Sequence, residues 1–297
     1  MDHDSGNIIE VSPEDLRTTN YQRGIVYKIL SGYSSRLVED LHKQLRQQGI
    51  QIQGESAETN LVHNGSGRAH MQRRGNENTS QPGVVESPGG AVEQGDMNHL
   101  IAASRELLEE NGILILYPTP PNIFYFYIWE HNDRKTGQDK TLIKYIFVFT
   151  VTNKQDAWLF EERVWNQDLK QAEGDQLLLF DPSEVSDTFS ITKGDMSQMS
   201  FWETNHRSMA EDPKTLVVRR RTYYILQDIF AMLPRLESPP DTQNRISYIE
   251  MASNADTPKL KLDGRPISNA ALEEGQADMI QSVIRKRFLE KGGQEQS

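Results

Sequence analysis

The sequence predicts an α+β fold, because its strand and helix patterns follow one another without the regular β-α-β alternation of a doubly wound protein. Runs rich in β-branched and aromatic side chains predict strands, and apolar residues that recur every three or four positions predict helices. We expect these elements to build one central sheet with helices packed against it. The predicted strands are residues 24–30, 59–63, 68–74, 84–86, 123–130, 142–151 and 176–180, and the predicted helices are 34–49, 98–110 and 215–233.

The first helix and the first hairpin have clear boundary signals. Serines stand where they can cap the start of helix 34–49, and Gly49 stands where a left-handed residue ends a helix. The turn-forming residues 64–67 separate two short strand patterns and predict an antiparallel hairpin. We expect helix 34–49 to pack on the core and the last helix, 215–233, to end before Pro234.

Two apolar and aromatic runs, 123–130 and 142–151, flank a charged turn and predict a second antiparallel pair. Along the first run, phenylalanines alternate with tyrosine and tryptophan. One set is therefore expected to face the core, and the other to be exposed on the sheet or to stack on a base. The two sets are Phe124 with Phe126, and Tyr125, Tyr127 with Trp129.

Three segments are predicted along the chain. Residues 1–55 form an N-terminal extension whose strand and helix pack on the core, and residues 56–235 form the main domain. Residues 236–297 form a C-terminal extension that begins as a polar, proline-containing linker. Apolar side chains between residues 279 and 288 then line one face of a predicted amphipathic helix.

The composition excludes several classes of site. Cysteine is absent from the 297 residues, which excludes disulfides, thiolate metal sites and cysteine nucleophiles. Any metal must therefore be held by oxygen or imidazole. The formal net charge of −11 disfavours a surface that binds long nucleic acid through its phosphates. A small phosphorylated ligand is the better expectation, since local basic patches could still bind it.

Nothing in the sequence predicts export or membrane insertion. Residues 1–5 are acidic and lack the basic-then-apolar pattern of a secretion signal. No apolar run approaches the length that spans a bilayer. We therefore expect a cytoplasmic protein, with a nuclear location left open.

Residues 88–113 carry the strongest chemical signal. On the predicted helix, offsets of three and four place Glu106, Glu109 and Glu110 on one face. Like charges this close destabilise an exposed helix by roughly a few tenths of a kcal/mol for each pair, so a counter-charge is expected. Mg²⁺ or Mn²⁺ fits, because hard divalent cations prefer oxygen ligands and share them with substrate phosphates. Gly89 and Gly90 let the backbone approach a phosphate or offer a carbonyl to the metal.

This segment resembles the signature of the Nudix hydrolases, which reads Gly, five residues, Glu, seven residues, Arg-Glu, aliphatic, any residue, Glu-Glu, any residue, Gly, aliphatic. The chain has Gly90, then Asp96, then Arg-Glu-Leu-Leu-Glu-Glu-Asn-Gly-Ile at 105–113, so the second half matches at every position. The first half departs twice, because Asp96 stands where Glu is expected and eight residues separate it from Arg105. We expect the extra residue to lengthen the loop before the helix. The likeness extends over about residues 56–233.

The resemblance implies a fold and a reaction. The fold would be an α/β/α sandwich with a mixed central sheet. The reaction would be metal-dependent hydrolysis of a nucleoside diphosphate linked to another group, such as a nucleotide sugar, a dinucleotide or a diphosphoinositol compound. The implied metal ligands are the Gly90 carbonyl, Glu106, Glu109 and Glu110. Arg105 would hold the carboxylates in place, since a planar guanidinium suits two-point pairing with a carboxylate.

Other site residues are expected outside this helix. Glu173 or Asp175 would take the proton from the attacking water. Arg73 and Arg74 would meet the outer phosphate of the substrate, or else lie on a surface strand. Gly89 would let the substrate approach the backbone closely.

Several other polar residues are expected to have ordinary roles. Asp96 could simply cap the helix that follows it. The arginines at 219–221 are expected on a solvated helix face rather than at an RNA site. Considered as zinc ligands, four of the 7 histidines lack the spacing of a zinc site: His63, His70, His99 and His131.

Two alternative functions stay open at this point. Basic pairs along the chain favour removal of pyrophosphate or a cap from an RNA 5′ end, although the overall acidity disfavours it. The inserted residue before the helix and the long extensions favour a non-catalytic ligand-binding protein that keeps the fold. The sequence does not name the substrate, because specificity in such a fold lies in loops.

Overall fold

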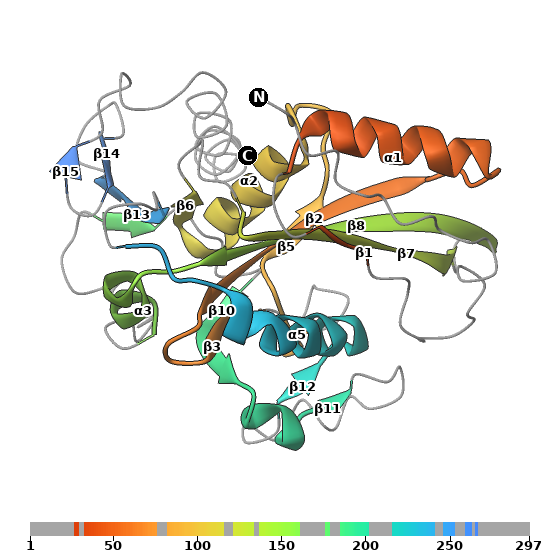
Figure 1. The fold of residues 1–297 in the computed structure, drawn as a ribbon. Coiled ribbons are helices and arrows are strands. Elements are labelled where there is room, and N and C mark those ends of the chain that lie inside the picture. The colour runs from red at the N-terminus through yellow and green to blue at the C-terminus, as the bar shows by residue number, and fades with distance from the viewer. Residues whose placement is uncertain are drawn as a thin grey trace, which may run out of the picture.

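A mixed sheet lies at the centre of the computed structural model, with helices on both of its faces (Figure 1). The structure describes residues 27–29, 33–75, 82–115, 121–133, 137–160, 176–178, 185–201, 216–240, 246–252, 259–262 and 265–266. The strands of this sheet are β1 (Tyr27–Ile29), β2 (Gly54–His63), β3 (Arg68–Arg74), β4 (Val85–Glu86), β5 (Gly89–Ala91), β7 (Ile123–Asp133), β8 (Gln138–Thr150), β10 (Val185–Thr192), β11 (Ser200–Phe201) and β12 (Val217–Val218).

The strand pairing makes the sheet mixed. Its main path runs β1-β7-β8-β2-β3-β4-β12-β11, with β5 added beside β2 and β10 beside β3. Strand β2 runs parallel to β8, and β12 runs parallel to β4 and β11, whereas the other pairs are antiparallel. Both predicted hairpins, β2 with β3 and β7 with β8, are confirmed. The predicted α+β class with a mixed central sheet is therefore confirmed.

Two layers of helix cover the sheet. Helices α1 (Ser35–Gln47) and α2 (His99–Asn111) lie on one face, and α5 (Arg220–Met232) lies on the other (Figure 1). A shorter helix, α3 (Asn153–Phe160), follows β8, and one-turn helices η2 (Asp195–Gln198) and η4 (Leu233–Arg235) follow β10 and α5. Two hydrophobic clusters, one under α1 and α2 and one under α5, fill the space between helices and sheet. This layering confirms the α/β/α sandwich.

Both faces of β7 are buried, which corrects the expectation that one set of its aromatic residues is exposed. Phe124 and Phe126 belong to the cluster under α1 and α2, while Tyr125 and Tyr127 belong to the cluster under α5. The alternation of side chains along the strand was read correctly. The burial of the tyrosine face of β7 was not predicted, because the helix that covers it, α5, follows much later in the sequence. The side chain of Trp129 lies outside the described residues.

The first two helix predictions are confirmed by their caps. The Ser34 hydroxyl accepts a hydrogen bond from the amide of Leu37 at the start of α1, and Gly49 beyond its end has a positive φ of 78°. The third helix begins later than expected. Val217 and Val218 form the short strand β12 between β4 and β11, so α5 starts only at Arg220.

The C-terminal region adds strands that the sequence did not predict. Strand β13 (Ile246–Ala252) pairs antiparallel with β6 (Ile113–Ile115), which directly follows α2. It also pairs with β9 (Gln176–Leu178), within the predicted strand 176–180, and with β14 (Lys259–Leu262), which pairs with β15 (Arg265–Pro266). The predicted linker therefore contains a strand of a second sheet. The amphipathic helix predicted at 279–288 lies outside the described residues.

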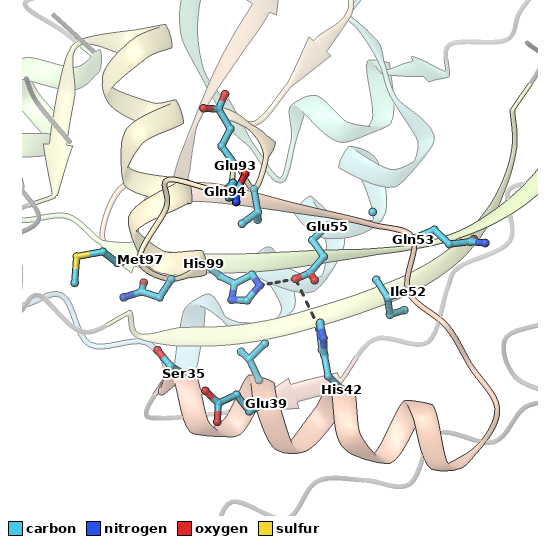
Figure 2. A pocket seen from close by; sticks show the side chains of 14 residues that line it. Ser35, Glu39, His42, Ile52, Gln53, Glu55, Glu93, Gln94, Met97 and His99 are labelled. Carbon is cyan, nitrogen blue, oxygen red and sulfur yellow. Dashed lines mark hydrogen bonds and ion pairs between the residues drawn. The ribbon is translucent and has the colours of Figure 1, made fainter. Parts of the chain in front are cut away.

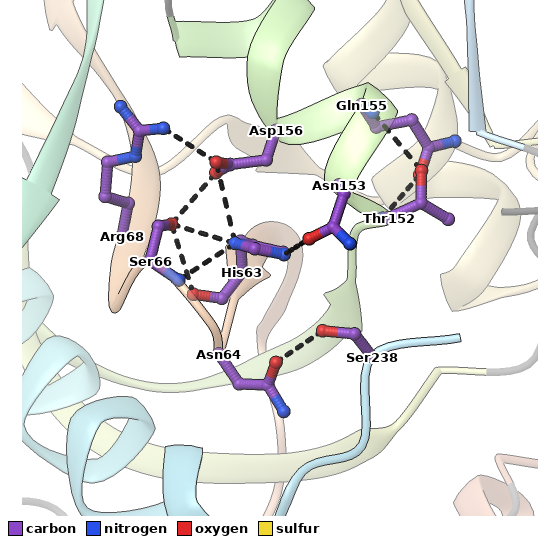
Figure 3. Close-up of polar contacts among 9 residues, drawn as sticks. All are labelled: His63, Asn64, Ser66, Arg68, Thr152, Asn153, Gln155, Asp156 and Ser238. Carbon is purple, nitrogen blue, oxygen red and sulfur yellow. Dashed lines mark hydrogen bonds and ion pairs between the residues drawn. The ribbon is translucent and has the colours of Figure 1, made fainter. Parts of the chain in front are cut away.

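A polar cluster ties the β2–β3 turn to α3 (Figure 3). The Asp156 carboxylate accepts hydrogen bonds from the Ser66 hydroxyl at 3.0 Å and from Arg68 at 2.6 Å. His63 lies against Ser66 through one ring nitrogen and against Asn153 through the other, at 2.9 Å each. The hydroxyl of Ser66 bonds the carboxylate directly, with no imidazole between them, so this geometry fixes a turn rather than activating a nucleophile.

None of the described helices combines the length and the apolar character that crossing a bilayer requires.

Candidate active site

Helix α2 carries the acidic residues that the sequence singles out. The Asn98 side chain accepts a hydrogen bond from the amide of Ile101 at 3.0 Å and starts the helix, and Gly112 ends it in the left-handed region at φ 66°. These ends match the predicted helix 98–110. Almost every side chain between the two caps is buried, since β2, β5 and β6 pack around the helix. The glutamates of α2 therefore face the interior of the protein rather than bulk water.

Arg105 orients the first two of these glutamates. Its Nη1 lies 2.9 Å from Oε1 of Glu106 and 3.5 Å from Oε1 of Glu109. Its Nε and Nη2 donate to the two carboxylate oxygens of Asp96 at 3.0 and 3.1 Å, and Nη2 also donates to the carbonyl of Ala91. Burial alone would lower the pKa of Arg105, but its hydrogen bonds to Asp96 and the charges of Glu106, Asp96 and Glu109 together outweigh burial and raise it. The guanidinium is therefore a permanent cation at the centre of the site.

The position of Asp96 corrects one expectation. Asp96 does not cap α2, because Asn98 does so. Its carboxylate instead accepts a hydrogen bond from the amide of Glu93 at 2.8 Å, which closes the turn before the helix, and pairs with Arg105. The side chain is only 4% exposed. Asp96 therefore connects the turn to the guanidinium that orients the glutamates.

Glu110 is a buried acid of the helix that two other strands contact. Its Oε2 accepts hydrogen bonds from Nε2 of Gln72 at 2.8 Å and from the amide of Gly89 at 2.9 Å. Burial raises the pKa of Glu110 well above its usual value, and the nearby negative charges of Glu86 and Glu106 raise it further. The hydrogen bonds from Gln72 and Gly89 oppose this shift without cancelling it, so the folded protein disfavours the charged form of Glu110.

Gly89 and Gly90 bring strand β5 close to its neighbours. Gly89 has φ 156°, and a Cβ atom there would lie 2.4 Å from the carbonyl oxygen of Ala57 and 2.7 Å from the Cα of Glu58. A Cβ atom on Gly90 would lie about 2.5 Å from the carboxylate of Glu106. The two glycines therefore allow different contacts: the first lets β5 pair with β2, and the second admits the glutamate side chain.

The two predicted phosphate-binding arginines lie on opposite faces of β3. The guanidinium of Arg73 lies over the ring of Phe189, 5.7 Å from its centre, on the face covered by α5. Arg74 instead donates to Oε1 of Glu86 at 2.6 Å. The other carboxylate oxygen of Glu86, Oε2, lies 2.9 Å from Nη1 of Arg219. Arg74 is thus connected through Glu86 to the acids around Glu110.

Arg219 departs from the solvated position expected for residues 219–221. Its side chain is 27% exposed, and it precedes the first turn of α5. Burial lowers the pKa of Arg219, and the charge of Glu86 opposes that effect. A similar pair lies nearby on β2 and β8, where Nζ of Lys144 lies 2.5 Å from Oε2 of Glu58. Arg74 and Arg219 therefore meet the acids of the site at Glu86, whereas Lys144 pairs with Glu58 on the face of the sheet that α5 covers.

Sequence reasoning missed several residues of this site. Glu86 had a usable signal, because it lies two residues before Pro88 of the Pro-Gly-Gly turn. The others come together only through strand register and the position of α5, which no local pattern encodes. The missed residues are Gln72, Glu86 and Arg219.

The metal set expected from the sequence is not gathered around one point. Among the described residues, no three His, Asp or Glu side chains form a group that could hold a metal ion. Glu106 and Glu109 instead contact Arg105, and Glu110 accepts hydrogen bonds from Gln72 and Gly89. The expected proton acceptors, Glu173 and Asp175, lie outside the described residues.

Comparisons with known proteins identify one domain. Residues 57–195 match the family model of the NUDIX domain, whereas no curated protein gave a significant match. Among solved structures, a NUDIX hydrolase from Nitrosomonas europaea is 15% identical with a TM-score of 0.34, and the match covers 64% of this chain and 98% of that one. The match to an Ap4A hydrolase from C. elegans has 13% identity, a TM-score of 0.30 and coverages of 62% and 99%.

A third match is a bifunctional NMN adenylyltransferase/ADP ribose pyrophosphatase from Francisella tularensis, complexed with AMP and a Mn ion. It is 15% identical, has a TM-score of 0.29 and covers 67% of this chain and 47% of that one. These structural similarities are low, so the domain match at residues 57–195 carries the comparison.

Proposed function

Because this chain carries a NUDIX domain at residues 57–195, we propose that it is a divalent-metal-dependent hydrolase of a pyrophosphate bond. Its substrate is a nucleoside diphosphate linked to another group, such as a nucleotide sugar, a dinucleotide or a diphosphoinositol compound. One observation carries the proposal: on a buried helix, Arg105 contacts Glu106 and Glu109, while Glu110 reaches the amide of Gly89.

The donor groups of the site suit Mg²⁺ or Mn²⁺. Glu106, Glu109 and Glu110 offer carboxylate oxygens and Gly90 offers a carbonyl, which are the ligands that hard cations prefer. The buried excess of negative charge around Glu110 also needs a cation to balance it. These four residues would hold the metal, and when bound it would supply positive charge against the phosphoryl oxygens of the substrate.

The protein's own residues would position the reactants. Arg105 keeps Glu106 and Glu109 oriented, because it contacts both and is itself fixed by Asp96. Arg74 is the better placed of the two candidate arginines to meet a substrate phosphate, since it lies beside Glu86 near the acidic helix. A preformed cationic group of this kind stabilises charge without reorganising during the reaction.

Three further steps would complete the reaction. Water attacks phosphorus, the P–O bond to the leaving phosphate breaks, and a carboxylate accepts the proton of the water. We keep Glu173 or Asp175 as the proposed acceptor. We keep Gly89 as a proposed substrate contact through its backbone; its side-chain direction faces Ala57 and Glu58, so the substrate would approach from another side.

A substrate panel tests the proposal. Purified protein is incubated with nucleotide sugars, dinucleotides and diphosphoinositol compounds, with and without Mg²⁺ or Mn²⁺, and released phosphate and nucleoside monophosphate are measured. We expect turnover of at least one class only with metal, and a loss of at least about a hundredfold in Glu109→Gln and Glu110→Gln. Glu39→Gln on α1 is the matched control, because it makes the same substitution at an exposed glutamate that does not belong to α2. Unchanged turnover in both α2 variants would overturn the assignment of the site.

A second candidate is a non-catalytic ligand-binding protein with the same fold. It is favoured by the contacts that Glu106, Glu109 and Glu110 make with protein groups. This candidate predicts nucleotide binding that does not need metal and no product with any class of substrate. The panel above separates the two functions, because calorimetric binding with no turnover is expected only for the second.

A further inference from the structure

A network of buried side chains connects strand β3 with Glu110 near the end of α2. Nε2 of His70 lies 3.1 Å from Oδ1 of Asn111. Nδ2 of Asn111 donates to Oε1 of Gln72 at 2.8 Å, and Nε2 of Gln72 donates to Oε2 of Glu110 at 2.8 Å. We call His70, Asn111 and Gln72 the amide network, because two side-chain amides join the imidazole to the carboxylate.

The fold brings this network together from two elements. His70 and Gln72 are two positions apart on β3, so their side chains point to the same face of the sheet. Asn111 is the last residue of α2 and directly follows Glu110. The exposed fraction is 1% for His70, 1% for Gln72 and 0% for Asn111, so each link of the network is shielded from water.

The hydrogen bonds of the network run in one direction. A primary amide has a carbonyl that accepts and an NH₂ group that donates. Because the carbonyl of Gln72 accepts from Asn111, its NH₂ group faces the carboxylate of Glu110. The carbonyl of Asn111 is then left to accept, so Nε2 of His70 must carry a hydrogen. Reversal would place the carbonyl oxygen of Gln72 against the carboxylate of Glu110, and two acceptors at that distance repel each other.

The side chain that holds Glu110 is uncharged, unlike the partners of another acid near α2. Figure 2 shows Glu55 beside two imidazoles, with its Oε2 at 2.6 Å from Nε2 of His99 and 3.7 Å from Nε2 of His42. An imidazole can take up a proton and balance the charge of the carboxylate. The amide of Gln72 instead orients Glu110 without supplying a positive charge that would compete with a metal ion.

We propose that the amide network positions the Glu110 carboxylate for a divalent metal ion. Both hydrogen bonds that the described residues give this carboxylate, from Gln72 and from the amide of Gly89, fall on Oε2. Oε1 is then the oxygen available to the ion, and a side chain that is already fixed loses less freedom when the ion binds. The inference rests on the proposed function, in which Glu110 is a metal ligand.

The motif of the helix does not assign these roles. The signature that the segment resembles allows any residue at the position of Asn111, and it begins at Gly90, after His70 and Gln72. The roles follow instead from the register of β3 against α2, which brings the three side chains into contact. They also give His70 a position beside the site, although its spacing in the sequence indicates no metal-binding role.

Manganese binding by the full-length protein, measured by electron paramagnetic resonance, tests the inference without any substrate. Gln72→Met keeps the length of the side chain but removes its donor, so it should weaken Mn²⁺ binding by about tenfold or more. His70→Phe removes the donor at the far end of the network and lets both amides reverse, so it should weaken Mn²⁺ binding by at least about threefold. His70→Gln supplies an amide that can again donate to Asn111 and should restore most of the affinity.

Thr59→Val is the matched control for the loss of a buried hydrogen bond. It removes the bond from the Thr59 hydroxyl to the carbonyl of Ala103 on α2, at 3.2 Å, and Thr59 lies outside the amide network. Urea unfolding measures the stability of every variant. A network that only stabilises the fold would lower the stability as Thr59→Val does and leave Mn²⁺ affinity unchanged.

Nitrogen NMR of the protein labelled in histidine tests the direction of the hydrogen bonds without metal. We expect a hydrogen on Nε2 of His70, with the signal assigned by His70→Gln. A bare Nε2 would overturn the inference, as would Mn²⁺ affinity that stays the same in Gln72→Met and His70→Phe. These results, with normal Mn²⁺ binding by the unchanged protein, would leave the proposed function intact. Failure of the unchanged protein to bind Mn²⁺ would overturn the proposed metal site together with this inference.

Discussion

Asp96 and Arg105 face each other with two parallel contacts, Nε to Oδ1 at 3.0 Å and Nη2 to Oδ2 at 3.1 Å. Both side chains are nearly buried, at 4% and 6% exposed. In the motif that this segment resembles, the corresponding acid is a Glu one residue closer to the arginine. Here the shorter Asp with one additional residue still reaches the guanidinium, because the turn from Glu93 to Asp96 folds the carboxylate back toward it. The two departures from the motif therefore compensate each other.

Asp96→Asn should weaken both folding and turnover. The amide keeps the shape of the side chain but removes the charge that fixes a nearly buried guanidinium, so the free energy of unfolding should fall by about 1–3 kcal/mol. Glu106 and Glu109 would lose their fixed orientation, and metal-dependent turnover should fall by about tenfold or more. Urea unfolding and the substrate panel measure the two effects. Asp40→Asn, on the exposed side of α1, is the control; equal stability of the two variants would contradict this role of Asp96.

Alanine at the two adjacent glycines should give different defects. Gly89→Ala would place Cβ against the backbone of Ala57 and Glu58 at a positive φ, so we expect a loss of more than about 2 kcal/mol of stability. Gly90→Ala would meet only the Glu106 carboxylate, which can move. It should fold well and bind Mn²⁺ at least about tenfold more weakly, as measured by electron paramagnetic resonance. Gly95→Ala is the control, since nothing lies near its Cβ position.

Much of the fold was predictable because local patterns define it. The serine cap and the left-handed Gly49 gave the first helix nearly to the residue, and the second was predicted at 98–110 against His99–Asn111 in the structure, although Asp96 and not Asn98 was the expected cap. The short strand at Val217 was not predictable, because two valines before a helix look like its first turn. Only its parallel pairing with β4 and β11 makes it a strand.

The candidate site was predictable only where it lies on one helix. The faces of α2 follow from helical spacing, so the direction of Glu106, Glu109 and Glu110 could be expected. Gln72, Glu86 and Arg219 reach the same region from β3, β4 and the start of α5. Their approach depends on strand register and on the packing of α5, which are long-range properties.

Glu110→Gln should make the metal-free protein more stable while reducing turnover. The folded protein raises the pKa of Glu110 through burial and the charges of Glu86 and Glu106, so the folded state binds the proton more tightly than the unfolded chain. Stability is therefore lost as pH rises from about 4.5 toward the folded pKa, and the loss is complete at still higher pH. A glutamine carries no charge and can still accept the hydrogen bonds from Gln72 and Gly89.

Thermal unfolding near neutral pH measures this effect. We expect a higher midpoint for Glu110→Gln than for the unchanged protein without metal, and a smaller increase on adding Mn²⁺. Glu39→Gln, an exposed residue, should shift the stability by no more than about 0.5 kcal/mol. A metal-free Glu110→Gln protein that unfolds at a lower temperature would show that the buried carboxylate stabilises the fold. That result would contradict the destabilising effect expected from burial and from the charges of Glu86 and Glu106.

The packing of α1 should be sensitive to mild acid through His42. Burial lowers the pKa of His42 from 6.5, and His99 and Arg46 act in the same direction, while Glu55 opposes them. The unfolded chain therefore binds the proton more tightly than the folded protein, so stability should fall as pH drops below about 6.5 and level off below the folded pKa. One proton contributes at most about 1.4 kcal/mol for each pH unit in that range. Tyr145 keeps its proton throughout, because burial raises its pKa.

Urea unfolding between about pH 5 and 6.5 isolates this contribution when the unchanged protein is compared with His42→Gln. The glutamine carbonyl can still accept a hydrogen bond from the Tyr145 hydroxyl but does not titrate, so the variant should lose less stability on acidification. Histidines that do not lie beside His42 contribute equally to both proteins and cancel in the difference. Glu55 titrates below this range, because its pKa is lowered from 4.5: burial would raise it, but the hydrogen bond from His99, the charges of His42 and His99 and the hydrogen bond from Tyr145 together outweigh burial. Parallel pH profiles for the two proteins would mean that His42 takes up its proton without disturbing the contact between α1 and the sheet.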